Sequence, residues 1–262
     1  MTSWEKFEIE STDYLNGTFG RYASFTHCGG SDSTTSDIKV VTESRNEFYI
    51  EAKESPAQCG QFVLLPDIVS NTFKYSKGNA APLDSYASSI IDYMNGSFEE
   101  YKDAGTAGKD ICFPGCSQIF TNWIIKHYRD KKVLFIITNN NTILPTEKFA
   151  DFFTVTAKYR VKRSGSGNVA QRMIPQVEEF LRNNFSVDSC FCEDRILFIT
   201  SDDDLHNRRF VIAGWEYRIS RSGNRYAIRR LSNTFNANVI FSINIKPGVQ
   251  GLSHPEFIDS LK

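Results

Sequence analysis

The spacing of apolar side chains at the start of the chain predicts one helix followed by two strands. Apolar residues recur at near-helical intervals over residues 3–15, which predicts a helix whose end is marked by Gly17 and Gly20. Residues 38–42 and 47–53 are short runs rich in β-branched and aromatic side chains, as strands are. The polar residues 44–46 between them predict a hairpin turn, so the two strands are expected to pair.

The middle of the chain is predicted to be helical up to one strongly apolar strand. A helix is expected to begin near Ser55-Pro56, because a proline in the first helical turn sacrifices no hydrogen bond. Apolar stripes predict further helices over residues 85–101 and 117–128. Residues 132–138 form an almost continuous apolar run, typical of a strand buried on both faces of a sheet. A helix that leads directly into such a strand favours its addition to the sheet of the earlier hairpin.

Beyond Pro145 the pattern becomes rich in strands. A helix is predicted over residues 170–183, and Ser222-Gly223-Asn224 has the composition of a hairpin turn. The predicted strands are residues 152–163, 195–201, 208–212, 216–221, 225–231 and 238–245. The chain is therefore expected to be α/β (α+β). A mixed sheet flanked by helices would occupy residues 1–150, and a β-rich basic region would occupy residues 151–262, with one integrated domain as the alternative.

Charge is balanced over the whole chain but concentrated near its end. The formal net charge is −1, so composition alone does not indicate a nucleic-acid partner. Between Leu205 and Lys246, however, there are eight Arg and Lys residues and a single acidic residue, Glu216. Because phosphate contacts are local, such a region suits an anionic partner, although a solvated basic face has the same composition.

Targeting signals are not evident in the sequence. Residues 1–10 lack the apolar stretch of a signal peptide, and no run approaches the roughly 20 apolar residues that cross a bilayer. The protein is therefore expected to be cytoplasmic and to have no membrane partner.

One set of charged residues lies on the predicted hairpin. Asp37 begins the first strand, and Glu51-Ala52-Lys53 ends the second after thirteen intervening residues. Residues two apart on a strand share a face, so Glu51 and Lys53 project together, and pairing of the strands brings Asp37 close to Glu51. Two converging carboxylates repel each other unless a cation binds them, which predicts Mg²⁺ at Asp37 and Glu51. Lys53 would orient the attacking water and offset charge on a phosphate. A solvated strand face is the alternative interpretation.

This arrangement resembles the PD-(D/E)xK nucleases over roughly residues 1–140. The resemblance implies a restriction-endonuclease-like core of helix, three strands, helix and strand, with the motif on a hairpin. It also implies that the backbone carbonyl of Ala52 is a metal ligand. The Pro that usually precedes the motif Asp is replaced here by Ser36, and Asp32 competes with Asp37 for the position of that Asp.

Three further polar residues extend the resemblance. Glu8, in the first predicted helix, is similar to the Glu that these nucleases often place near the metal. Gln58 and Gln61, in the helix predicted after Ser55-Pro56, stand where members of the superfamily often have a polar helix residue beside the site. An exposed polar helix face accounts for the same three residues.

Two later segments are candidates for DNA contacts. Residues 158–162 place three basic side chains on one face of a predicted strand that ends in a small polar loop, although an edge strand protected by charge has the same pattern. The second candidate segment is the hairpin at residues 217–233. A two-stranded ribbon fits the major groove, where Arg and Asn side chains can recognise bases. The candidate contacts are Lys158, Arg160, Lys162, Arg163, Ser164, Ser166, Arg218, Arg221, Asn224, Arg225, Arg229, Arg230 and Asn233.

Other chemistries lack their motifs. Residues 105–109, Gly-Thr-Ala-Gly-Lys, have neither the spacing nor the preceding strand of a phosphate-binding loop, so no nucleotide cofactor is expected. The four histidines are scattered, and no G-x-S-x-G motif occurs.

The resemblance implies a Mg²⁺-dependent type II restriction endonuclease. Such an enzyme cuts double-stranded DNA at a specific sequence and leaves a 5′-phosphate and a 3′-hydroxyl. A homodimer is expected by analogy, since a two-fold DNA site presents two strands to two identical subunits. A repair, recombination or mobile-element nuclease of the same superfamily is the first alternative, and a non-catalytic DNA-binding protein is the second.

Overall fold

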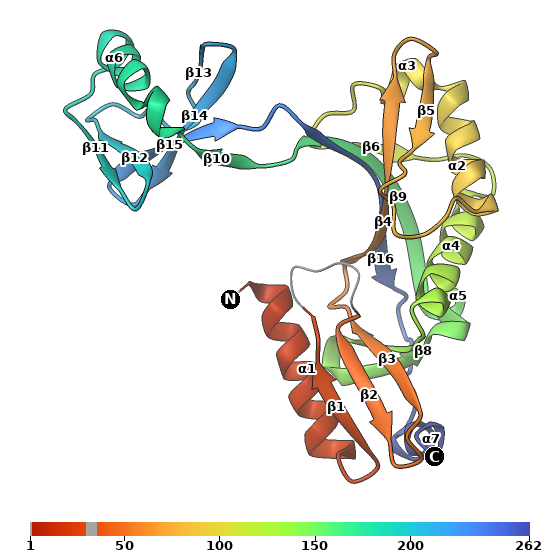
Figure 1. The fold of residues 1–262 in the computed structure, drawn as a ribbon. Helices are drawn as coiled ribbons and strands as arrows, with labels where there is room; N and C mark the ends of the chain where they lie inside the picture. The colour runs from red at the N-terminus through yellow and green to blue at the C-terminus, as the bar shows by residue number, and fades with distance from the viewer. Residues whose placement is uncertain (1, 30–35) are drawn as a thin grey trace. The chain divides into compact units, whose positions relative to one another are not determined.

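The computed structural model describes residues 2–29 and 36–262 and divides the chain into two compact units (Figure 1). The first unit contains the residues up to Arg160 together with Ala237–Lys262, and the second unit is Val161–Asn236. Asp32, the alternative to Asp37, lies outside the described residues.

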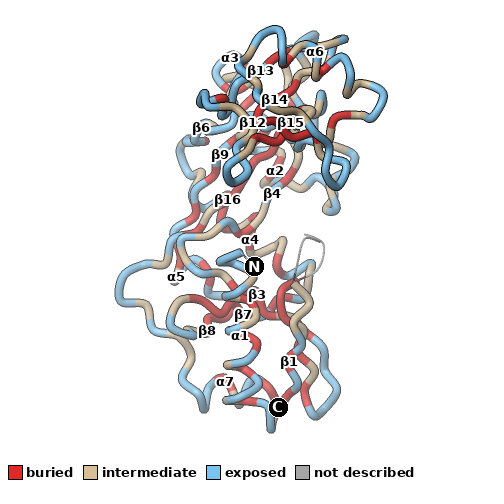
Figure 2. The backbone as a smooth tube through the Cα atoms, turned by 90° about the vertical axis from the view of Figure 1, so that its left-hand side faces the viewer, coloured by how far each residue is buried: buried red, intermediate tan, exposed pale blue. Residues whose placement is uncertain are grey.

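The first unit contains a five-stranded sheet with the order β1-β2-β3-β7-β8. Strands β2 and β3 form an antiparallel hairpin, and β7 joins β3 in parallel, so the predicted hairpin and the predicted addition of the apolar strand are both confirmed. The elements are α1 (Ser3–Phe19), β1 (Ala23–His27), β2 (Ile38–Thr42), β3 (Glu47–Ala52), β7 (Val133–Thr138), β8 (Thr142–Pro145) and α7 (His254–Ser260). Helices α1 and α7 contribute Leu15, Phe19 and Phe257 to the core of this sheet, each fully buried. Figure 2 shows β3 and β7 as mostly buried strands.

A second sheet in the same unit has the order β5-β4-β16-β9-β6. Figure 1 shows α2 and α4 along one face of it, where Trp123 of α4 stacks on Phe241 of β16 with ring centroids 4.4 Å apart. The strands are β4 (Ala57–Asp67), β5 (Thr72–Tyr75), β6 (Lys109–Ile111), β9 (Phe153–Arg163) and β16 (Phe235–Ile245). The helices are α2 (Ser85–Gly96), α3 (Phe98–Tyr101), α4 (Cys116–Asp130) and α5 (Phe149–Phe152), with 3₁₀ turns η1 (Asn139–Asn141) and η2 (Thr146–Lys148).

The second unit is a sheet with the order β11-β12-β15-β14-β13, and β10 pairs with β15. Its core gathers Val177 and Leu181 of α6 with Ile219 and Ile228 of the sheet, all fully buried. The predicted turn is confirmed, because Ser222 pairs with Arg225 across a two-residue connection. The elements are β10 (Ser166–Asn168), η3 (Gln171–Met173), α6 (Ile174–Asn184), β11 (Ser189–Glu193), β12 (Ile196–Thr200), β13 (Arg209–Ile212), β14 (Trp215–Ser222) and β15 (Arg225–Leu231).

Two predictions of secondary structure are wrong. The segment after Ser55-Pro56 is the strand β4 rather than a helix, because it pairs with β16 from the far end of the chain. The helix predicted over residues 85–101 is broken at Ser97 into α2 and α3. Within residues 2–29 and 36–262, no helix is long and apolar enough to cross a membrane.

The boundaries between the two units lie after Arg160 and after Asn236, and not near residue 150 as the sequence predicts. Strand β9 begins in the first unit and ends in the second, and β16 returns from the second unit to the first. The first eight residues of β9 and most of β16 belong to the first unit because they complete its second sheet. The smaller unit is therefore an insertion into the larger one, and residues 151–262 do not form a separate region.

Candidate active site

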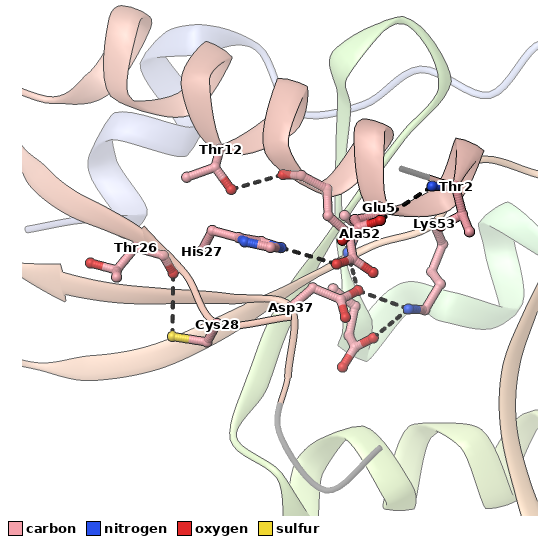
Figure 3. Close-up of polar contacts among 11 residues, drawn as sticks. Thr2, Glu5, Thr12, Thr26, His27, Cys28, Asp37, Ala52 and Lys53 are labelled. Carbon is pink, nitrogen blue, oxygen red and sulfur yellow. Dashed lines mark hydrogen bonds and ion pairs between the residues drawn. The ribbon is translucent and has the colours of Figure 1, made fainter. Parts of the chain in front are cut away.

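Asp37 and Lys53 meet at the end of the β2–β3 hairpin. The register pairs Ile38 with Ile50, which places Asp37 beside the last residues of β3. One carboxylate oxygen of Asp37, Oδ2, accepts hydrogen bonds from the backbone N–H of Ala52 at 2.9 Å and from Lys53 Nζ at 2.8 Å (Figure 3). The Asp37 side chain is therefore held by the chain segment that carries the rest of the motif.

Glu51 contacts the same ammonium group, that of Lys53. Lys53 Nζ is 2.7 Å from Glu51 Oε2, and both the Asp37 and Glu51 residues are buried, at 7% and 5% exposure. Burial raises the pKa of Glu51, against the opposing effect of Lys53. Burial alone would lower the pKa of Lys53, but Glu51 and Asp37 stabilise its charged form more strongly and raise that pKa above the ordinary value. Lys53 thus remains protonated between two carboxylates.

The backbone of Lys53 is fixed by the neighbouring strand. Its N–H donates to the carbonyl of Ile137 at 2.9 Å, and its carbonyl accepts from Thr138 Oγ1 at 2.6 Å. Both partners belong to β7, the buried strand that pairs with β3 in parallel. The apolar run recognised in the sequence therefore positions the lysine.

Glu8 reaches the same region from α1. It is only 5% exposed, and its Oε2 lies 3.0 Å from His27 Nε2. Burial raises the pKa of Glu8, the hydrogen bond from His27 opposes this, and the Asp37 charge adds to the increase. Gly29 packs against this pair so closely that a Cβ atom there would clash with Glu8 Oε2. The sequence reasoning missed His27, and the signal available was its place at the end of an alternating run, Ala23–His27.

Gln58 and Gln61 lie on strand β4, so the helical position predicted for them is wrong. Gln58 Nε2 donates to Gln61 Oε1 at 3.2 Å, and Asn238 Nδ2 donates to the same oxygen at 3.2 Å. Both glutamines nevertheless border the site, because β4 follows the motif strand directly. Both glutamines line the same cavity as Glu51 and Lys53.

These residues line one cavity of about 720 Å³ in the first unit. Glu8, Asp37, Glu51, Ala52 and Lys53 form one part of its wall, and Gln58 and Gln61 another; α4 adds Trp123, His127 and Tyr128. Among the described residues, no group of three or more His, Cys, Asp or Glu side chains is arranged to hold a metal ion. Any metal here would rely on the two motif carboxylates, backbone oxygen and water.

The candidate DNA contacts are divided between the two units. Lys158 and Arg160 belong to the first unit with the motif, and the others belong to the second. Several arginines of the second unit have internal partners. These contacts join Arg163 to Glu216, Arg221 to Asp204, Arg225 to Glu193, Arg229 to Asn168, and Arg230 to the ring of Trp215. The other second-unit candidates are Lys162, Ser164, Ser166, Arg218, Asn224 and Asn233.

Comparison with known proteins finds one informative similarity. No model of a protein family matches the chain, and no curated protein sequence matches it. A solved structure of HhaI endonuclease in complex with DNA, however, is similar along almost the whole length. The two chains are 37% identical with a TM-score of 0.72, and the match covers 98% of this chain and 96% of the other. Identity at this level over nearly full length means that the chain belongs to the family of HhaI endonuclease.

Proposed function

We propose that this protein is a Mg²⁺-dependent endonuclease that hydrolyses double-stranded DNA at a specific sequence, as a type II restriction enzyme does. The observation that carries the proposal is the buried set of Asp37, Glu51 and Lys53, with Lys53 Nζ 2.8 Å and 2.7 Å from the two carboxylates, in an open cavity. The similarity to an endonuclease solved with DNA supports the same chemistry.

The donor set fits Mg²⁺. Two buried carboxylates, those of Asp37 and Glu51, share the ammonium group of Lys53, and a third, that of Glu8, contacts His27. Mg²⁺ commonly takes one or two carboxylates and retains several waters, so a complete protein cage is not required. Asp37 and Glu51 would hold the ion, with the Ala52 carbonyl as the ligand that the motif implies. Bound there, the ion would polarise a phosphodiester and lower the pKa of a coordinated water.

The protein side chains have separate tasks in this proposal. Lys53, which stays protonated, holds the attacking water and balances the charge that develops on the phosphate. Glu8 adds a further carboxylate at the edge of the site, and His27 orients it through the 3.0 Å contact. Hydrolysis that displaces the 3′ oxygen gives a 5′-phosphate and a 3′-hydroxyl. A homodimer that cuts both strands stays a prediction.

Digestion of unmethylated phage DNA and plasmid DNA with Mg²⁺ tests the proposal. Glu51→Gln keeps the size of the side chain and removes its charge, while Glu47→Gln makes the same change at the exposed start of β3. We expect discrete fragments from the wild type and from Glu47→Gln, and none from Glu51→Gln. A smear of fragments that requires both Mg²⁺ and Glu51 would favour a repair or recombination nuclease. DNA binding without Mg²⁺-dependent cleavage by the wild type would contradict the assignment of an enzyme.

A further inference from the structure

A polar groove of about 330 Å³ crosses the second sheet of the first unit. The groove lies on the exposed face of this sheet. On strand β9 the side chains that point to that face, Thr154, Thr156 and Lys158, are exposed, and the alternate residues Val155 and Ala157 are buried. The helices α2 and α4 cover the other face (Figure 1). The groove is lined by Gln58, Thr106, Ala107, Asp110, Thr156, Lys158, Arg160, Ile240 and Ser242.

Gln58 connects this groove to the proposed active site. It lines both the groove and the 720 Å³ cavity, and Ser242 of the groove is its direct partner on β16. The bond from Gln58 Nε2 to Gln61 Oε1 fixes the orientation of the amide. An amide nitrogen carries two N–H groups, so one donor of Gln58 remains for a ligand at the junction. A chain molecule seated in the cavity could therefore continue past Gln58 into the groove.

The side chains of the groove suit an anionic ligand. Lys158 and Arg160 are two residues apart on β9 and therefore point to the same face. Thr106, Thr156 and Ser242 add hydroxyl donors around them. Among the described residues that line the groove, the one carboxylate is that of Asp110, 3.5 Å from Lys158 Nζ, and both side chains are largely exposed. An exposed pair of this length contributes little, so Lys158 can exchange its partner at small cost.

The loop before β6 is built to lie against Lys158. Gly108 has a φ of +75°, and a Cβ atom there would come within 2.8 Å of Lys158 Cγ. This close approach holds Thr106 and Ala107 beside the basic side chains, so backbone and hydroxyl donors face the groove from the loop. Phosphate groups of a nucleic-acid backbone take such a mixture of cationic and neutral donors.

We propose that this groove binds backbone phosphates of the DNA strand that occupies the cavity, next to the phosphodiester that is cut. The inference rests on the proposed function, and it assigns Lys158 and Arg160 to phosphate contact rather than to the reading of bases. The mixture of donors carries no pattern that distinguishes one base pair from another. Loss of the groove should therefore weaken binding to all sequences alike.

Binding to a fluorescein-labelled duplex of mixed sequence tests the groove without cleavage, in buffer with EDTA and at several salt concentrations. Each lost phosphate contact lowers the slope of log affinity against log salt by about 0.9. Lys158→Ala with Arg160→Ala should therefore reduce that slope by about 1 to 2 and weaken binding roughly tenfold at low salt. Asp110→Asn should raise the affinity about twofold to fivefold, because it removes a negative charge that lies beside Lys158 in the groove.

Lys109→Ala is the matched control. Lys109 is exposed on the same short strand as Asp110 but points away from the groove, since neighbouring residues on a strand face opposite sides. We expect wild-type affinity and slope from it. Circular dichroism and thermal melting establish that each variant is folded.

The two proposals fail in different ways. If the wild type binds and cuts DNA but the Lys158→Ala, Arg160→Ala variant has an unchanged salt slope, the groove proposal is wrong and the nuclease stands. The groove proposal is equally wrong if Asp110→Asn weakens binding. If the wild type binds with the expected slopes but never cuts, the active-site proposal is wrong and the groove stands. A wild type that binds no duplex overturns both.

Discussion

The ammonium of Lys53 lies 2.8 Å from the carboxylate of Asp37, which precedes it by sixteen residues and the whole β2–β3 hairpin. The contact depends on strand register, because the same Asp37 oxygen also accepts the backbone N–H of Ala52. A one-residue slip of the hairpin would turn the side chains of one strand to the opposite face and separate the pair. The hydrophobic pairing of β2 and β3 thus determines whether the charged site exists.

Replacement of Lys53 by Met should abolish cleavage and destabilise the protein. The change leaves two buried carboxylates without their shared cation, and loss of one partner from a buried ion pair typically costs about 3–5 kcal/mol. We expect a loss of about 3 kcal/mol in the free energy of unfolding and at least a roughly hundredfold loss of cleavage rate. Urea denaturation and single-turnover cleavage measure the two effects.

Lys39→Met is the comparison for that change. Lys39 pairs with Glu47 at 2.9 Å, but the two side chains are 33% and 55% exposed. A pair of this kind is worth less than about 1 kcal/mol. Equal destabilisation by Lys53→Met and Lys39→Met would show that the buried ammonium does not stabilise the carboxylates.

Gly29→Ala should disturb the Glu8–His27 pair. The added methyl group would overlap Glu8 Oε2 and approach His27 Nε2 to 3.0 Å. Because the Glu8 side chain is buried, we expect a loss of about 1–3 kcal/mol in stability and a lower cleavage rate. Gly17→Ala, inside α1, meets no atom within 4 Å and should instead stabilise the protein by roughly 0.5–1 kcal/mol. Differential scanning calorimetry would show melting temperatures moving in opposite directions, and a shift in the same direction would contradict the packing argument.

The hairpin and its charged residues could be predicted from sequence because the information is local. Strand spacing, turn composition and the two-residue separation of Glu51 and Lys53 all lie within residues 37–53. The helix that leads directly into the apolar run of residues 132–138 predicts that this run joins the same sheet. The structure confirms that placement, and it adds that this strand holds the Lys53 backbone.

The errors arose where distant segments decide the local structure. Residues 57–67 follow Pro56, a residue that suits the first turn of a helix, but Ala57–Val63 pair with β16 about 180 residues later. Gly60 allows this strand to lie against Trp123, since a Cβ atom would approach Trp123 Cζ3 to 2.8 Å. The division into units was misplaced for the same reason, because β9 and β16 each serve two units. Neither pairing leaves a signal in its own stretch of sequence.

The lowered pKa of His127 should make the free energy of unfolding decrease in mild acid. Burial lowers the pKa of His127 to about 4, and its ring stacks on Trp123 with centroids 5.0 Å apart. In the unfolded chain the pKa is about 6.5, so between these values the unfolded state binds a proton that the folded state does not. Stability from this residue is therefore complete above about pH 6.5 and decreases, by at most about 3 kcal/mol, as the pH falls to 4.

The variant His127→Phe isolates that contribution. It keeps an aromatic ring against Trp123 and removes the titrating group, so the unfolding free energy should fall less between pH 6.5 and pH 4 than in the wild type. His254→Gln, at an exposed residue on α7, should retain the wild-type decrease. Parallel curves for the wild type and His127→Phe across this range would show that His127 is not held in its neutral form in the folded protein.

The basic residues of the second unit should separate into structural and DNA-binding groups. The Arg225 guanidinium lies 3.8 Å from the ring centroid of Phe198 and 2.5 Å from Glu193. A cation over an aromatic ring contributes about 0.5–1 kcal/mol or more, so Arg225→Ala should lower stability by roughly 1 kcal/mol. Because these contacts already occupy the guanidinium, its removal should change DNA affinity less than about twofold.

Lys162→Ala should have the opposite effects. Lys162 is exposed on β9, and among the described residues it forms no ion pair. If it contacts phosphate, its loss should leave the melting temperature unchanged and lower the salt slope of duplex binding by about 0.9. Anisotropy titrations and thermal melting of the two variants measure both quantities. A loss of affinity in Arg225→Ala without a loss of stability would mean that the Glu193 pair opens and that Arg225 itself reaches the DNA.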